Sequence, residues 1–160
     1  MKRYFLLLGV VAFLMSLASC FPQVVKTDLP NLLANPEKFQ GKEVIVTADL
    51  KSVLESPGDY RGRKIELSGY VDYRGWRGFR AWHFFLIDKE GRKARCYEKV
   101  YRVEGWIVPI VTVKRAAREQ KLLTVVGKLE KSMNIELDYI EYEGRHIDTD
   151  TKPSHFANGF

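Results

Sequence analysis

Residues 63–88 read RKIELSGYVDY (63–73), RGWRGFR (74–80) and AWHFFLID (81–88). In the first segment Ile65, Leu67 and Val71 share one face of a strand, while charged and hydroxyl side chains share the other. Gly69 falls on the apolar face, where a glycine lets a strand bend sharply around a barrel corner. The last segment is apolar on both faces, which predicts a central strand. We therefore expect two strands joined by a basic and aromatic turn.

The chain after this hairpin supplies the elements that would close a barrel. A tight turn at 88–91 leads to a third strand over 93–97. The spacing of Ile110, Val113 and Ala117 predicts a helix over 109–120. Two more strands are expected over 122–129 and 135–142.

This order of elements resembles the OB-fold, a five-stranded Greek-key barrel whose helix lies between the third and fourth strands. The residues that carry the resemblance are Ile65-x-Leu67-x-Gly69-x-Val71, Phe85-Leu86-Ile87-Asp88-x-x-Gly91 and Leu123-x-Val125-x-Gly127-x-Leu129. The resemblance implies a mainly β fold with the barrel over 63–143, and it implies nothing about a ligand. The linker 98–108, which contains Trp106, is longer than a minimal OB-fold needs.

A repeat precedes the barrel, because Leu33–Val46 recurs at Leu54–Leu67. Pro36 matches Pro57, so the offset is 57 − 36 = 21 residues. Each copy predicts a short helix ending at a proline, then an aromatic residue, a glycine turn and a strand. We therefore expect a helix-strand-helix lead-in over 29–62.

The strand of the first copy, Glu43–Ala48, has two interpretations. In the first, both copies are simply the same local helix-turn-strand structure. In the second, it is an additional strand that pairs with its own barrel or with another chain. Pairing in parallel with residues 64–73 would use the helix expected over 50–56 as the crossover.

Residues 1–19 have the layout of a signal peptide, with Lys2 and Arg3 before an uncharged apolar run over 4–15. The run is shorter than the ~20 residues of a spanning helix. Leu17-Ala18-Ser19-Cys20 resembles the lipobox of bacterial lipoproteins. In that family the cysteine becomes the first residue of the mature protein and carries diacylglyceryl and N-acyl chains such as palmitate.

The lipobox resemblance implies lipidation at Cys20, and an ordinary cleaved signal is the alternative. Residues 20–28 would then be a lipidated N-terminus and tether that hold the chain on the extracytoplasmic face of a membrane. Acyl chains contribute ~0.8 kcal/mol per buried methylene, so several chains would attach the protein permanently. Phe21 follows the cysteine where an Asp would signal inner-membrane retention, so the outer membrane is favoured.

Composition sets few limits on the function. The chain has 160 residues, enough for one domain, and a formal net charge of +6. Loss of Lys2 and Arg3 leaves 24 basic and 20 acidic residues, or +4. This mild excess permits attraction to anionic lipid, polysaccharide or nucleic acid and demands none of them. Acylation of Cys20 would leave Cys96 without an intramolecular disulfide partner.

The turn between the first two barrel strands is the candidate binding site, because in OB-folds that loop commonly rims the binding face. Tryptophan and arginine are frequent hot-spot residues in protein contacts. They also meet anionic lipid headgroups, or stack bases and hold phosphates. The plainer interpretation is that the aromatic rings cover the end of the barrel under arginine stems. The candidate residues are Arg74, Trp76, Arg77, Phe79, Arg80 and Trp82.

The residues that suggest chemistry do not form a recognisable set. We interpret His83 as a hydrogen-bonded core residue and Cys96 as a small buried hydrophobe. His146, Asp148 and Asp150 alternate at spacings of no metal motif, and they lie in a stretch expected to be a flexible tail over 144–160. We therefore expect no catalytic residue, no metal and no cofactor.

Three classes of function follow from these features. The favoured one is a non-catalytic binding module of the cell envelope, anchored through Cys20, with an envelope protein or anionic polymer as partner. The alternative is an OB-type single-stranded nucleic-acid-binding protein, which export disfavours. An envelope enzyme or metal protein would use His83, or His146 with Asp148. The sequence does not predict an oligomeric state.

Overall fold

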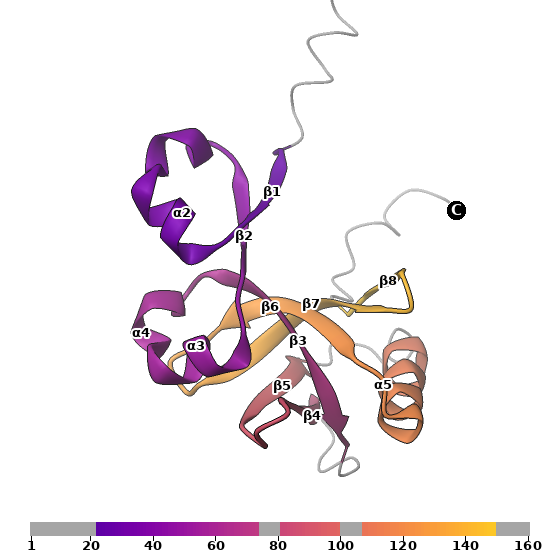
Figure 1. Ribbon diagram of the computed structural model, residues 1–160. Helices are drawn as coiled ribbons and strands as arrows, with labels where there is room; N and C mark the ends of the chain where they lie inside the picture. The colour runs from indigo at the N-terminus through magenta and orange to yellow at the C-terminus, as the bar shows by residue number, and fades with distance from the viewer. Residues whose placement is uncertain (1–21, 74–80, 100–106, 150–160) are drawn as a thin grey trace, which may run out of the picture.

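The computed structural model describes residues 22–73, 81–99 and 107–149 (Figure 1). Their elements, in chain order, are β1 (Val24–Thr27), α2 (Leu29–Ala34), η2 (Pro36–Phe39), β2 (Glu43–Thr47), α3 (Leu50–Glu55), α4 (Pro57–Tyr60), β3 (Lys64–Asp72), β4 (Ala81–Ile87), β5 (Lys93–Lys99), α5 (Ile107–Glu119), β6 (Leu123–Leu129), β7 (Asn134–Tyr142) and β8 (Arg145–Asp148).

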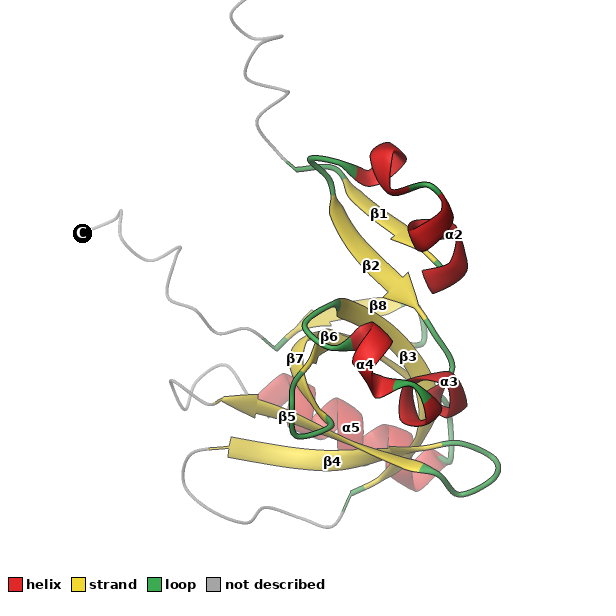
Figure 2. Ribbon diagram, turned by 90° about the vertical axis from the view of Figure 1, so that its left-hand side faces the viewer, coloured by secondary structure: helices red, strands yellow, loops and turns green. Residues whose placement is uncertain are grey.

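Five of these strands close a barrel (Figure 2). Their order around it is β3-β4-β5-β7-β6, and β6 pairs again with β3 to complete the circle. Neighbouring strands are antiparallel except β5 and β7, which run parallel. The fold is mainly β with an OB-fold-like barrel, as the order of elements predicted. Along the chain, α5 connects β5 to β6.

The barrel core consists of alternate residues of each strand. In β3 Ile65 and Leu67 are fully buried, while Ser68 on the other face is exposed. In β4 Phe84 and Leu86 are fully buried. Each such side chain contributes roughly 1.5–3 kcal/mol when it leaves water. The predicted alternation in residues 64–73 is therefore confirmed, and it places one face of each strand outside the barrel.

Two glycines lie where barrel strands approach most closely. A Cβ on Gly69 would lie 2.8 Å from the carbonyl oxygen of Ile87, and one on Gly127 would overlap the carbonyl oxygen of Glu136. The pairing of β6 with β7 is also irregular between Val126 and Gly127. Glycine therefore serves the close approach of strands at both positions.

The two repeat copies form successive, equivalent units of a parallel ladder, β1-β2-β3. Val24 lies opposite Glu43 in the first pairing, and Ile45 lies opposite Lys64 in the second. The spacing is the same in both, since 43 − 24 = 64 − 45 = 19 residues. The strand β2 thus pairs with its own barrel, along the part of β3 that precedes the pairing with β4. The helix α3 provides the crossover.

The local geometry of the two copies also matches. The Asp28 carboxylate accepts a hydrogen bond from the Asn31 backbone N–H at 2.7 Å, and Asp49 accepts one from that of Ser52 at 2.8 Å. These bonds cap α2 and α3. The turns that follow the aromatic residues contain Gly41 and Gly62 with φ of 74° and 76°. In this left-handed region glycine has no steric penalty.

Ion pairs hold the first copy against the barrel. Lys26 of β1 pairs with Glu66 of β3, and its ammonium lies 3.7 Å from a carboxylate oxygen of Glu141 in β7. Lys64 of β3 reaches Glu43 of β2 at 2.5 Å and Asp138 of β7 at 2.7 Å. The hydrogen bond to Glu66 raises the pKa of Lys26. These contacts make the ladder continuous with the barrel wall.

Two segments differ from the sequence prediction. Val24–Thr27 was expected in a tether but forms β1, because the outer edge of β2 offers it a parallel partner. Arg145–Asp148 was expected in a flexible tail but forms β8, which pairs with β7 through a turn at Glu143 and Gly144. Those two turn residues have φ of 50° and 75°. Within the described residues, no helix is long and apolar enough to cross a membrane.

Candidate functional site

The predicted binding turn lies mostly outside the described residues. This applies to Arg74, Trp76, Arg77, Phe79 and Arg80, and also to Cys20. The backbone of Trp82 belongs to β4 and lies opposite Glu98 of β5, but its side chain is not described. The structure does place the two strands that the turn joins: β3 ends at Asp72 and β4 begins at Ala81.

The outer face of β4 and β5 contains aromatic and basic side chains, as the turn does. Because Phe84, Leu86, Ala94 and Cys96 point into the core, their neighbours point outward. His83 lies opposite Tyr97, Phe85 opposite Arg95, and Ile87 opposite Lys93. We call these six residues the β4–β5 face.

The position of His83 corrects the sequence prediction. It was interpreted as a core residue, but its ring is half-buried on the outer face, 6.2 Å from the ring of Phe85 in an edge-to-face arrangement. The cause is that both faces of residues 81–87 are apolar, so alternation alone did not reveal which one points inward. The histidine therefore belongs to the β4–β5 face.

The cations of the β4–β5 face differ in how they are paired. The Lys93 ammonium lies 3.1 Å from a carboxylate oxygen of Asp72 on β3. Arg95 is exposed and has no carboxylate partner in the part of the chain that the structure describes. An unpaired guanidinium between aromatic rings suits a carboxylate or phosphate ligand, which it can bind with two parallel hydrogen bonds.

Tyr97 connects this face to a neighbouring pocket. Burial raises the pKa of its phenol, and a hydrogen bond to Glu130 raises it further. The phenol therefore stays neutral at physiological pH and donates to the Glu130 carboxylate. Glu130 in turn lines a pocket of about 430 Å³ at the turn between β6 and β7.

The lining of that pocket is mainly basic. It contains Arg61, Lys128 and Lys131 together with Glu130 and Ser132. None of the three cations forms an ion pair with another described residue. The pocket adjoins the β4–β5 face at Tyr97, where Glu130 and Glu136 also lie, and basic residues outnumber acidic ones in its lining.

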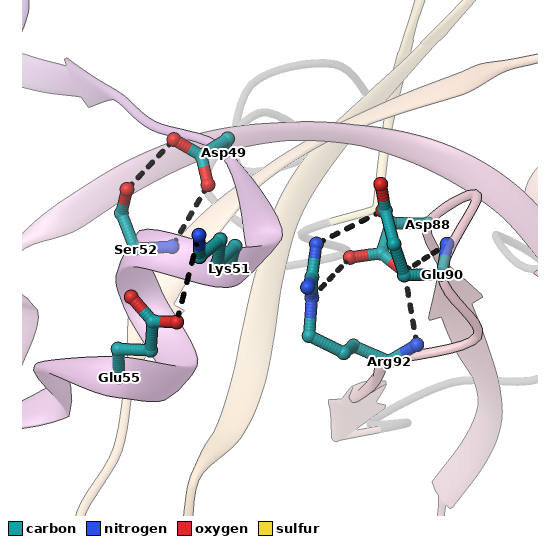
Figure 3. Close-up of polar contacts among 7 residues, drawn as sticks. All are labelled: Asp49, Lys51, Ser52, Glu55, Asp88, Glu90 and Arg92. Carbon is teal, nitrogen blue, oxygen red and sulfur yellow. Dashed lines mark hydrogen bonds and ion pairs between the residues drawn. The ribbon is translucent and has the colours of Figure 1, made fainter.

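At the turn that joins β4 to β5, charged side chains form hydrogen bonds that stabilise the turn itself. Figure 3 shows Asp88 accepting hydrogen bonds from the backbone N–H groups of Glu90 and Arg92 at 3.0 and 2.9 Å, with the Arg92 guanidinium at 2.6 Å. Burial alone would raise the pKa of Asp88, but the bonds from Arg92 hold it below its ordinary value. Asp49 is likewise engaged as the cap of α3. These carboxylates stabilise a turn and a helix end.

The other residues with reactive side chains are placed as follows. Cys96 is fully buried, as predicted, and burial raises the pKa of its thiol far above the ordinary value. The exposed His146 has its Nε2 2.9 Å from Asp148 and its ring centroid 4.1 Å from that of Tyr139. Asp150 lies outside the described residues. Over residues 22–73, 81–99 and 107–149, no group of three or more metal-binding side chains forms a site.

Several residues of this surface were not identified from the sequence. Their signal is present, because Lys93-x-Arg95-x-Tyr97 alternates with buried Ala94 and Cys96. The basic pocket has no comparable signal. Its residues Arg61, Lys128 and Lys131 meet only because Gly62 and Leu129 bond through their backbones, Gly62 N–H donating to Leu129 O at 2.8 Å.

Comparisons with known proteins add little to this description. No family model matches the chain, and no curated protein matches it. One solved structure, "OBody AM1L10 bound to hen egg-white lysozyme", aligns with 56% of this chain and 82% of that chain, at 16% identity and a TM-score of 0.36. The description of the barrel therefore rests on its own strand pairing.

Proposed function

We propose that the protein is a lipid-anchored, non-catalytic binding module of the cell envelope, and that its OB-fold-like barrel binds an anionic partner. The observation that carries this proposal is the β4–β5 face, where Arg95 lies among His83, Phe85 and Tyr97 with no carboxylate partner in the described segments. The lipobox-like Leu17-Ala18-Ser19-Cys20 supports the anchor. The partner is an acidic envelope protein or an anionic envelope polymer.

The chemistry of the surface supports a binding role. Aromatic rings supply contact area with little loss of side-chain freedom, and arginine supplies directed hydrogen bonds to carboxylate or phosphate. The basic pocket would extend the contact beyond the hairpin, and the turn residues Trp76 and Arg77 would extend it over the barrel end. The Asp88 and Asp49 carboxylates are committed to structural bonds.

The experiment is crosslinking and pulldown from envelope membranes with Arg95→Glu, and separately with Trp76→Ala/Arg77→Ala. The matched control is Arg118→Glu, which makes the same charge change at an arginine on α5 whose side chain is 79% exposed. We expect Arg95→Glu to weaken partner capture roughly tenfold, since a hot-spot residue contributes more than ~1 kcal/mol. Unchanged capture by both site variants would contradict the proposal.

The second candidate is binding of single-stranded nucleic acid, favoured by the combination of aromatic and basic residues on an OB-fold-like barrel. It predicts oligonucleotide affinity that falls steeply as salt rises, because bound cations are released from phosphates. Fluorescence anisotropy with a labelled oligonucleotide tests it directly. Absence of binding at low salt would exclude this candidate.

A further inference from the structure

We propose that the apolar face of the first repeat copy lies against the surface of the membrane that anchors the chain. This inference rests on the proposed lipid anchor at Cys20. The occupant of the face is the interfacial region of the bilayer, where acyl chains meet headgroups. The first copy thereby fixes the orientation of the barrel above the membrane.

The face in question is an open groove between α2, η2 and β2. Its volume is about 630 Å³, and its lining includes Leu32, Leu33, Pro36, Phe39 and Val44. Leu33 is exposed here, with 60% of its surface accessible. Glu37, Gln40 and Arg63 also line the groove, and of the described lining only Arg63 lies outside the first copy.

The second copy shows what kind of residue these positions hold. Its counterparts of Leu32 and Phe39 are Val53 and Tyr60, which are 1% and 7% exposed because they pack into the end of the barrel. In the first copy Leu32 and Val44 are half-buried against the core, whereas Leu33 and Pro36 are exposed and Phe39 is half-exposed. The exposed parts of Leu33, Pro36 and Phe39 leave apolar surface uncovered at the groove, and uncovered apolar surface of this sort marks an interaction site.

The position of the groove identifies the membrane as its occupant. The backbone carbonyl of Gln23 accepts a hydrogen bond from the Glu43 N–H at 3.1 Å, which fixes the start of β1 beside the start of β2. Only Phe21 and Pro22 separate Gln23 from Cys20. Since a residue spans at most ~3.5 Å, an acylated Cys20 would hold this end of the molecule within roughly 10 Å of the bilayer.

The surrounding charges suit such a surface. Lys38 in η2 and Lys42 in the following turn are exposed at the same end of the first copy, and neither pairs with a carboxylate among the described residues. Their stems can lie along apolar surface while their ammonium groups reach anionic headgroups. Figure 1 shows α2 and β1 projecting beyond the barrel strands, at the start of the described chain.

The test is spin labelling of the full acylated chain in vesicles of phosphatidylethanolamine and phosphatidylglycerol. A nitroxide is attached to Leu33→Cys, and the matched control carries it at Arg118→Cys on α5. Both sites are exposed, so neither substitution disturbs the core. Cys96 is fully buried and Cys20 is acylated, so the new cysteine alone reacts. Collision rates with oxygen and with a water-soluble nickel complex report the depth of the label.

We expect vesicle attachment to raise the oxygen rate and lower the nickel rate several-fold at position 33, with no change at position 118. If the chain floats with the vesicles while label 33 stays as accessible to nickel as label 118, membrane contact is overturned and the anchor stands. Protection of label 33 from both reagents would also overturn it, in favour of a protein contact. A chain that does not float would overturn the anchor and the contact together.

Discussion

The two repeat copies have similar local structure but differ in how deeply their side chains are buried. In each, an aspartate caps a short helix, a proline starts a second helical turn, and a glycine with φ near 75° leads into a parallel strand. In the second copy Leu50, Val53 and Tyr60 are buried in the barrel. In the first copy Leu33 is exposed and Phe39 borders an open groove.

This difference separates the features that local sequence determines from those that tertiary packing determines. Caps, turns and strand register follow from the repeated residues, because their hydrogen bonds and torsions depend on near neighbours. Burial follows from packing against the barrel, which differs between the copies. Leu29, the counterpart of Leu50, is buried in the same core, whereas Leu32 and Phe39 are only half-buried where Val53 and Tyr60 are buried. The comparison therefore predicts equal effects for substitutions at caps and turns, and unequal effects for substitutions at apolar positions.

The largest expected difference is at the matched aromatic positions. Tyr60→Ala should lower the free energy of unfolding by about 3–5 kcal/mol, because it leaves a cavity at the end of the barrel. Phe39→Ala should cost less than half as much, because its ring is already half-exposed. Urea denaturation of both variants measures the difference. Equal losses would contradict the contrast in burial.

The turn glycines come next, and here the copies should agree. Gly41→Ala and Gly62→Ala force an L-residue into the left-handed region, at a cost of roughly 1–2 kcal/mol each. An added Cβ meets no neighbouring atom at either position, so strain is the whole effect. Gly58→Ala is the control, since Gly58 has open space around it and no positive φ. A large difference between Gly41 and Gly62 would argue against local control.

The helix caps should also behave alike. Asp28→Ala and Asp49→Ala each remove a side-chain acceptor and should cost about 1 kcal/mol, while serine at either position should restore most of it. The hydrogen bond from the Ser52 backbone holds the pKa of Asp49 below its ordinary value of 3.8. The contribution of Asp49 is therefore complete above that value and is lost as pH falls through the lowered pKa.

Denaturation at a series of pH values checks this last point. Asp49→Asn should flatten the acid side of the stability profile relative to wild type. A profile that Asn leaves unchanged would mean that the cap does not depend on the charge of Asp49.

The smallest expected effect is at Leu33. Leu33→Ser should change the stability of the unacylated chain in buffer by only a few tenths of a kcal/mol, because the side chain is mostly in water already. Leu54→Ser, at the matched position, should cost more, because Leu54 is half-buried against the core. Thermal unfolding of the two variants is the measurement, and a larger loss at Leu33 would show that something covers it.

The sequence predicted the elements whose residues alternate over five or more positions. The faces of β3 and the burial of Cys96 follow from that pattern, and both are present in the structure. The strands β1 and β8 were missed because each has four residues and exists through its partner. Such a short run carries too little alternation to be recognised alone.

The candidate site was predictable only in part. The basic and aromatic turn was visible as a run of residues, whereas the β4–β5 face is assembled from two strands in register. The outward position of His83 required knowledge of which face enters the barrel. The sequence did not predict that Arg61 lies beside Lys128 and Lys131, because their proximity depends on the contact between the second copy and β6.

Hydrogen exchange of the unacylated chain in buffer tests most directly whether the two copies differ through their surroundings. The matched segments are residues 29–41 and 50–62, which have the same capped first helix and the same glycine turn, with a 3-10 turn at η2 and an α-helical turn at α4 between them. We predict that amides of 29–41 exchange through local opening while those of 50–62 exchange only as the barrel unfolds. Equal protection of the two segments would contradict this, because it would mean that the barrel does not set the stability of the copy that it buries.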